Sequence, residues 1–119
     1  MHVVIVTDRR DALHEFVQGL GKDVEWTDSA AGILARAKNP PWQLVVLDAM
    51  MPGLDYKVFL MDLLKVNAML NTVVITDMDA EAFHHDSEGL GVLCAVPALP
   101  GRDDGVRAMD LLCTLLGLW

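Results

Sequence analysis

Aspartates follow three of the apolar runs in this 119-residue chain. Asp8 comes after residues 3–7, Asp48 comes after residues 44–47, and Thr76-Asp77 comes after residues 72–75. Because the carboxyl ends of neighbouring parallel strands meet at one sheet edge, these carboxylates would repel one another unless a cation neutralised them. An oxygen-only cluster suits Mg²⁺, beside which an aspartate can attack a phosphoryl group, and the Thr76 hydroxyl can hydrogen-bond a phosphoryl oxygen.

A simpler interpretation of each aspartate competes with this chemistry. An aspartate after a strand is a common helix cap or turn residue. Taken singly, each of the three is more simply explained in that way. Their occurrence at three strand ends together favours a shared site.

The elements that must position these residues alternate between strands and helices. Apolar runs predict strands at 3–7, 24–27, 44–47, 72–75 and 92–96. Helical spacing predicts helices at 13–20, 30–37, 56–69 and 80–87, and a last one with the stripe Val106, Met109, Leu112, Cys113 and Leu116. Gly21 is predicted to end the first helix, and Asp28 or Ser29 to cap the second. This order predicts a three-layer α/β/α sandwich whose five-stranded parallel sheet has the flavodoxin-like order 2-1-3-4-5.

Composition narrows the class of protein. The length predicts one domain, residues 1–119, and the net charge of −8 argues against a nucleic-acid surface. Cys94 and Cys113 fit no metal or redox spacing, so free thiols are expected. With no signal peptide and no apolar stretch long enough for a membrane span, we expect a cytoplasmic location.

One segment resembles the phosphoacceptor segment of bacterial response regulator receiver domains, the CheY-like domains of two-component signalling: Val46-Leu47-Asp48-Ala49-Met50-Met51-Pro52-Gly53-Leu54-Asp55. The resemblance extends over nearly the whole chain. It implies that Asp48 accepts phosphate and that Thr76 contacts the phosphoryl group. It also implies that Asp8, Asp48 and the backbone carbonyl of Met50 hold Mg²⁺.

Several residues depart from the pattern of that family. Thr7 replaces one carboxylate of the acidic pair, and Val96 replaces the lysine that precedes Pro97. Asp77 stands where a small residue is expected, and Leu93 where an aromatic switch residue is expected. Losing a cation and adding an anion both disfavour a bound phosphoryl group, so we expect a degenerate receiver with a weakened Mg²⁺ site. The resemblance also implies a cis Val96–Pro97 bond.

We therefore predict a non-catalytic receiver domain of phosphorelay signalling, with Asp48 as phosphoacceptor in an incomplete site. Its partners would be a histidine kinase or a phosphotransfer protein, or a second copy of the chain. The second copy would bind through the face made by the helix at 80–87, the strand at 92–96 and the last helix. The alternative is a constitutive interaction domain that works without phosphorylation. A third interpretation, a small phosphatase or flavin carrier, has no glycine-rich phosphate loop to support it. Trp119 is predicted to pack back on the domain, to mark a dimer contact or to precede a further domain.

Overall fold

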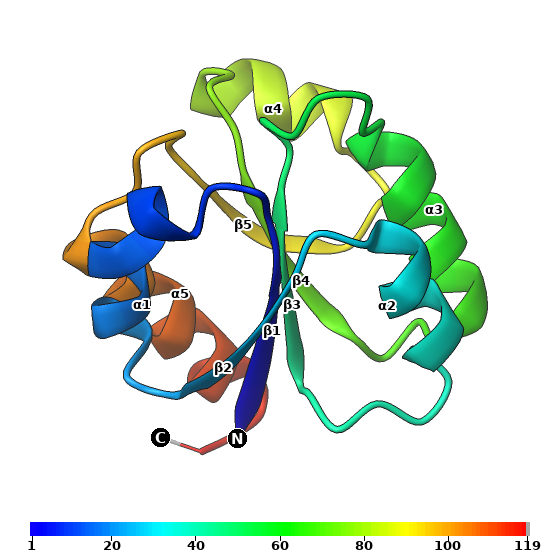
Figure 1. The fold of residues 1–119 in the computed structure, drawn as a ribbon, viewed down its shortest axis with the longest axis horizontal. Helices are drawn as coiled ribbons and strands as arrows, with labels where there is room; N and C mark the ends of the chain where they lie inside the picture. Colours follow the sequence, from blue (N-terminus) through cyan, green and yellow to red (C-terminus); the bar gives the residue numbers. More distant parts are fainter. Residues whose placement is uncertain (119) are drawn as a thin grey trace.

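The structure is a computed structural model that describes residues 1–118. Strands and helices alternate along the chain, as predicted (Figure 1). The strands are β1 (His2–Val6), β2 (Asp23–Thr27), β3 (Leu44–Asp48), β4 (Asn71–Ile75) and β5 (Val92–Val96). The α-helices are α1 (His14–Leu20), α2 (Ala30–Arg36), α3 (Tyr56–Val66), α4 (Ala80–Asp86) and α5 (Arg102–Leu115), and a 3-10 turn, η1 (Arg10–Leu13), precedes α1.

The sheet is parallel and has the strand order β2-β1-β3-β4-β5, which confirms the predicted topology. Figure 1 shows α1 and α5 on one side of the sheet and α2 and α3 on the other. Phe83 places α4 on the side of α2 and α3, because it packs in the same core cluster. Strands β1, β3 and β4 are neighbours, so their carboxyl ends lie side by side.

The core forms two layers, one on each face of the sheet. Side chains alternate along a strand, so Val3 and Ile5 of β1 pack under α1 and α5, whereas Val4 and Val6 pack under α2 and α3. All five residues of β3 are buried, including Asp48. This burial on both faces explains why the central strands read as continuous apolar runs.

Helices α1 and α5 approach each other unusually closely, at two glycines. A Cβ atom added to Gly105 would lie 2.2 Å from the carbonyl oxygen of Phe16, and one added to Gly19 would lie 2.0 Å from that of Arg102. Since no Cβ atom fits at such distances, both positions require glycine. The backbones of the two helices therefore touch directly.

Several local predictions need correction. The helix predicted over 56–69 ends at Val66, because Asn67 adopts an extended conformation. Val106 lies on the outer face of α5 with 42% of its surface exposed, and Ala108 points to the core in its place. Of the two residues predicted as caps of α2, Asp28 and Ser29, the structure confirms Ser29. No peptide bond of residues 1–118 is cis, so the expectation for Val96–Pro97 was wrong.

Strand β5, the last strand of the sheet, is irregular where it pairs with β4. The register with β4 shifts between Thr72 and Val73, which leaves Leu93 without a partner in the ladder. The Arg107 guanidinium donates a hydrogen bond of 2.9 Å to the carbonyl oxygen of Ala95. A side chain of α5 thus covers one of the backbone acceptors of this strand.

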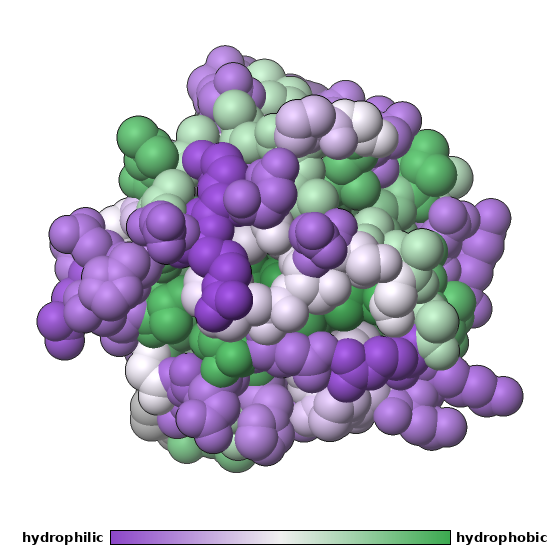
Figure 2. Space-filling view, in the orientation of Figure 1, coloured by the Kyte–Doolittle hydropathy of each residue, from purple (hydrophilic) through white to green (hydrophobic). Residues whose placement is uncertain are grey.

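The surface alternates between polar and apolar areas. On the face drawn in Figure 2, hydrophilic side chains separate several small hydrophobic areas. No helix of residues 1–118 is long and apolar enough to cross a membrane. Trp119 lies outside the described residues, so the prediction of its contacts stays a prediction.

Candidate functional site

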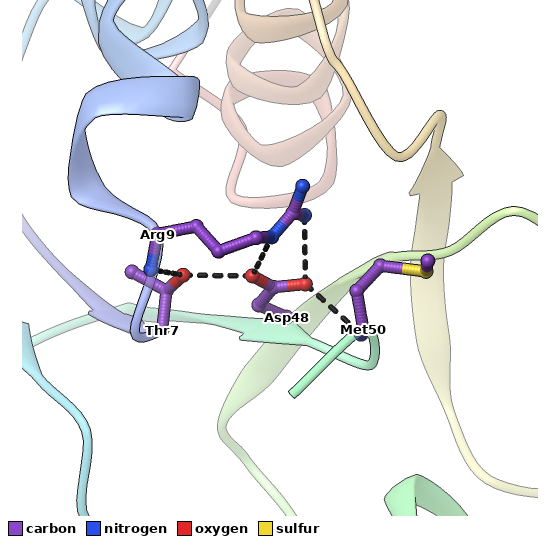
Figure 3. A network of polar contacts seen from close by, with 4 residues as sticks. All are labelled: Thr7, Arg9, Asp48 and Met50. Atoms are coloured by element: carbon purple, nitrogen blue, oxygen red, sulfur yellow. Dashed lines mark hydrogen bonds and ion pairs between the residues drawn. The ribbon is translucent and has the colours of Figure 1, made fainter. Parts of the chain in front are cut away.

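Asp48 ends β3 at the centre of the sheet's carboxyl edge, and its side chain is fully buried. Four protein groups donate hydrogen bonds to its carboxylate (Figure 3). Oδ2 accepts from the hydroxyl of Thr7 at 2.7 Å and from Nε of Arg9 at 2.8 Å. Oδ1 accepts from Nη2 of Arg9 and from the backbone N–H of Met50, each at 3.0 Å. Because a carboxylate offers about four acceptor positions, the protein itself fills all of them.

Arg9 supplies the positive charge at this site. Its guanidinium binds Asp48 through two parallel hydrogen bonds, the geometry that gives the strongest ion pairs in proteins. These hydrogen bonds raise the pKa of Arg9 above its usual value. Burial opposes this rise, and the charges of Asp48 and Asp8 add to it to a smaller extent. The Arg9 side chain remains positively charged wherever the fold persists.

The loop after β1 holds Arg9 in place. The backbone N–H of Arg9 donates to Oγ1 of Thr7 at 2.9 Å, and the carbonyl oxygen of Arg9 accepts from Ala12 at 3.0 Å. Thr7 therefore links the loop to the carboxylate, because its hydroxyl accepts from Arg9 and donates to Asp48. The loop, the guanidinium and Asp48 form one continuous network.

The other predicted site residues lie near Asp48 without contacting its carboxylate. Asp8 is exposed and forms no hydrogen bond or ion pair within residues 1–118. Thr76 is buried, follows the register partner of Asp48 in β4, and accepts a hydrogen bond from the N–H of Met78 at 3.2 Å. Met50 presents its N–H to Asp48, whereas a metal site would use its carbonyl oxygen. The roles predicted for Asp8, Asp48, Met50 and Thr76 stay predictions.

The neighbouring departures from the receiver pattern lie around the same edge. Val96 is buried at the end of β5, and Asp77 is exposed after β4. No group of three His, Cys, Asp or Glu side chains in residues 1–118 is arranged to hold a metal ion. Within that part of the chain, Arg9 is the only basic residue in an ion pair with Asp48.

Sequence reasoning missed Arg9. The search for a cation considered only the lysine position before Pro97, because the resemblance directs attention there. The available signal was local: an arginine follows Thr7-Asp8 directly, on a loop that the strand order places over the end of β3. Its long side chain can reach the neighbouring strand end from that loop.

A second polar cluster connects α3 to α4. The hydroxyl of Tyr56 donates to Asp86, and Nζ of Lys57 donates to the other oxygen of that carboxylate at 3.2 Å. The Tyr56 ring stacks on Phe83 with 5.6 Å between the ring centres. Burial, together with the hydrogen bond to Asp86, raises the pKa of Tyr56 well above its usual value. These contacts tie the start of α3 to the end of α4.

Comparison with known proteins reveals a likeness of fold. No family model and no curated sequence matches the chain. Among solved structures, a CheY-like response regulator receiver domain protein from Methanospirillum hungatei JF-1 superposes with a TM-score of 0.78 at 19% identity, over 99% of this chain and 98% of that one. A receiver domain protein from Clostridium thermocellum gives 0.78 at 16% identity, over 98% and 97%. The chain has the fold of a receiver domain.

A third receiver structure is informative about metal binding. The receiver domain of a sensor histidine kinase from Pseudomonas aeruginosa PAO1 superposes with a TM-score of 0.72 at 12% identity, covering 98% of this chain and 97% of that one. It is described with a magnesium ion coordinated in its active-site cleft.

Proposed function

We propose that this chain is a receiver-type signalling domain of two-component systems that acts by protein interaction and without phosphorylation. The observation that supports this choice is the saturated carboxylate of Asp48, whose oxygens accept from Thr7, Arg9 and Met50. The phosphorylation-independent alternative from the sequence thus becomes the preferred interpretation.

The chemistry of phosphoryl transfer explains the preference. Attack on a phosphoryl group requires a free carboxylate oxygen and a cation that stabilises the developing charge. Freeing an oxygen of Asp48 means breaking an ion pair whose carboxylate is fully buried and whose arginine side chain is 26% exposed. Leaving a buried charge without its partner costs up to about 3–5 kcal/mol, and the exposure of Arg9 reduces that cost. The buried Val96 and the exposed anion of Asp77 offer no compensating attraction for a phosphoryl group.

The remaining parts of the proposal follow from this role. We assign residues 1–119 to one non-catalytic domain and place it in the cytoplasm, where it would meet histidine kinases and phosphotransfer proteins. A second copy would bind through the face of α4, β5 and α5. That face carries exposed apolar side chains on α5, including Val106, Leu111 and Leu115.

Incubation with acetyl phosphate and Mg²⁺, followed by intact-mass spectrometry, tests the proposal. We expect no phosphoryl adduct on the wild-type protein. Arg9→Gln should acquire some adduct because it frees the carboxylate, and Asp48→Asn should abolish it in that background. Arg10→Gln is a matched control, since Arg10 lies over the Trp26 ring rather than against Asp48.

A second candidate function is a phosphorylated receiver with Asp48 as phosphoacceptor, Thr76 as phosphoryl contact, and Mg²⁺ bound by Asp8, Asp48 and the carbonyl of Met50. It is favoured by the placement of Asp48 and Thr76 at adjacent strand ends. An acid-stable, hydroxylamine-labile adduct on wild-type Asp48 would decide for it. Hydrolysis of a phosphate ester that is lost in Asp48→Asn would instead indicate an enzyme.

A further inference from the structure

We infer that the guanidinium of Arg9 occupies the cation position of the Asp48 site, so that a side chain of the protein replaces the divalent metal ion. This inference deepens the proposed function and rests on it. It concerns what neutralises Asp48, whereas the proposed function concerns whether Asp48 takes up phosphate.

The groups around Asp48 do not fit Mg²⁺. This ion takes oxygen ligands in near-octahedral geometry at about 2.0–2.1 Å. The groups that face the carboxylate are instead hydrogen-bond donors: the hydroxyl of Thr7, the guanidinium of Arg9 and the N–H of Met50. The oxygen of Thr7 is also engaged, because it accepts from the N–H of Arg9. This set of groups suits a carboxylate rather than a metal ion.

Charge balance leads to the same conclusion. Asp48 and Arg9 carry opposite unit charges and lie in direct contact, so the partly buried pair is neutral. A divalent ion added to it would leave an excess of two positive charges, and burying uncompensated charge is costly. Thr7 stands where a second carboxylate would reduce that excess, and Asp8 is exposed and forms no hydrogen bond with Asp48 in residues 1–118.

The internal cation also has a kinetic and entropic advantage over a free ion. Two backbone hydrogen bonds fix the loop that carries Arg9, through Thr7 and Ala12. A tethered group does not lose translational freedom when it binds, as a free ion does. Mg²⁺ must displace this group before it reaches either oxygen of Asp48, as the position of the guanidinium in Figure 3 makes clear.

Metal titration of the protein and three variants tests the inference. The thermal midpoint is measured with and without about 10 mM Mg²⁺ at matched ionic strength, and Mn²⁺ is added as a paramagnetic probe of amide NMR signals. We expect no Mg²⁺-specific shift in the wild type or in Arg10→Gln, and no selective broadening at residues 48–50. The double variant Thr7→Asp, Arg9→Ala should gain about 4 °C or more with Mg²⁺ and show that broadening.

Arg9→Gln serves as the second variant if the double variant does not fold, and its Mg²⁺ shift should exceed that of the wild type. Selective broadening at residues 48–50 in the wild type would overturn the inference. Folded variants whose thermal midpoint does not change with Mg²⁺ would overturn the inference as well, because the exclusion of the ion would not then depend on Arg9. A phosphoryl adduct on wild-type protein that binds no metal would refute the proposed function alone and leave the assignment of Arg9 intact.

Discussion

Replacing Gly105 by alanine tests the closest contact in the fold. In an isolated helix the change would be favourable, because alanine is preferred to glycine in a helix interior by about 1 kcal/mol. Here the new methyl group would meet the carbonyl oxygen of Phe16 at 2.2 Å and the backbone nitrogen of Leu20 at 2.8 Å. Backbone atoms cannot rotate away as a side chain can, so α1 and α5 must move apart.

The size of the effect follows from that separation. An ordinary contact between carbon and oxygen needs roughly 1 Å more than the structure provides, and gaps of that size forfeit a quarter to a half of the dispersion energy. The gap would open under Phe16, Ala108 and Leu112, which are fully buried. Overpacking of this kind typically costs about 1–3 kcal/mol and occasionally more. After the gain in helix propensity of about 1 kcal/mol is subtracted, we expect a net loss of about 1–2 kcal/mol and a fall in thermal midpoint of about 5–10 °C.

Urea unfolding followed by circular dichroism provides the measurement. Gly32→Ala is the control, because the atom nearest its added Cβ, at 3.1 Å, belongs to the adjustable side chain of Ser29, and its effect should stay within about 1 kcal/mol. The double variant Gly19→Ala, Gly105→Ala should lose less than the sum of the single losses, since one separation relieves both clashes. A Gly105→Ala protein as stable as the wild type would refute the close backbone packing of α1 on α5.

Three further predictions concern other parts of the molecule. The raised pKa of Tyr56 disfavours its phenolate in the folded state, so the associated stability is complete below pH about 10 and is lost as pH rises above it. Absorbance at alkaline pH should show that this single tyrosine ionises at lower pH in Asp86→Asn than in the wild type. An unchanged titration curve would contradict the role of Asp86. Asp55→Ala should destabilise the protein by about 1 kcal/mol in urea unfolding, because Asp55 accepts hydrogen bonds from the first N–H groups of α3; no change would mean that the cap is dispensable. Burial raises the pKa of the Cys94 thiol. In a Cys113→Ala background, Cys94 should therefore react with Ellman's reagent at pH 8 several-fold more slowly in the folded than in the unfolded protein. Equal rates would contradict the burial of Cys94.

The fold was predictable because its signals are local and agree with one another. Each central strand is apolar throughout, and each is followed by a helix with a one-sided apolar stripe, which together allow few topologies. The end of α3 was less predictable, since the apolar residues beyond Val66 continue the helical pattern although Asn67 turns away. The position of Val106 was misjudged because α5 carries apolar residues on two faces, and only the packing against α1 selects one of them.

The site was predictable only in part, for a different physical reason. The strand order identifies which residues share an edge, and Asp48 and Thr76 lie at adjacent strand ends as the order requires. Which group neutralises a buried carboxylate depends on the reach and conformation of a loop side chain. Neither property has a periodic signature in the sequence, so the guanidinium of Arg9 became apparent only in three dimensions.

The irregular edge of β5 has a consequence for how copies of this domain could associate. An exposed parallel edge normally invites another chain to add a strand through backbone hydrogen bonds. Here the bulge at Leu93, in the ladder with β4, bends the strand, and Arg107 already occupies the carbonyl oxygen of Ala95. Growth of the sheet into a continuous intermolecular ribbon is obstructed on this side. Contacts made along β5 must therefore be built from side chains, which allows them to be selective and reversible.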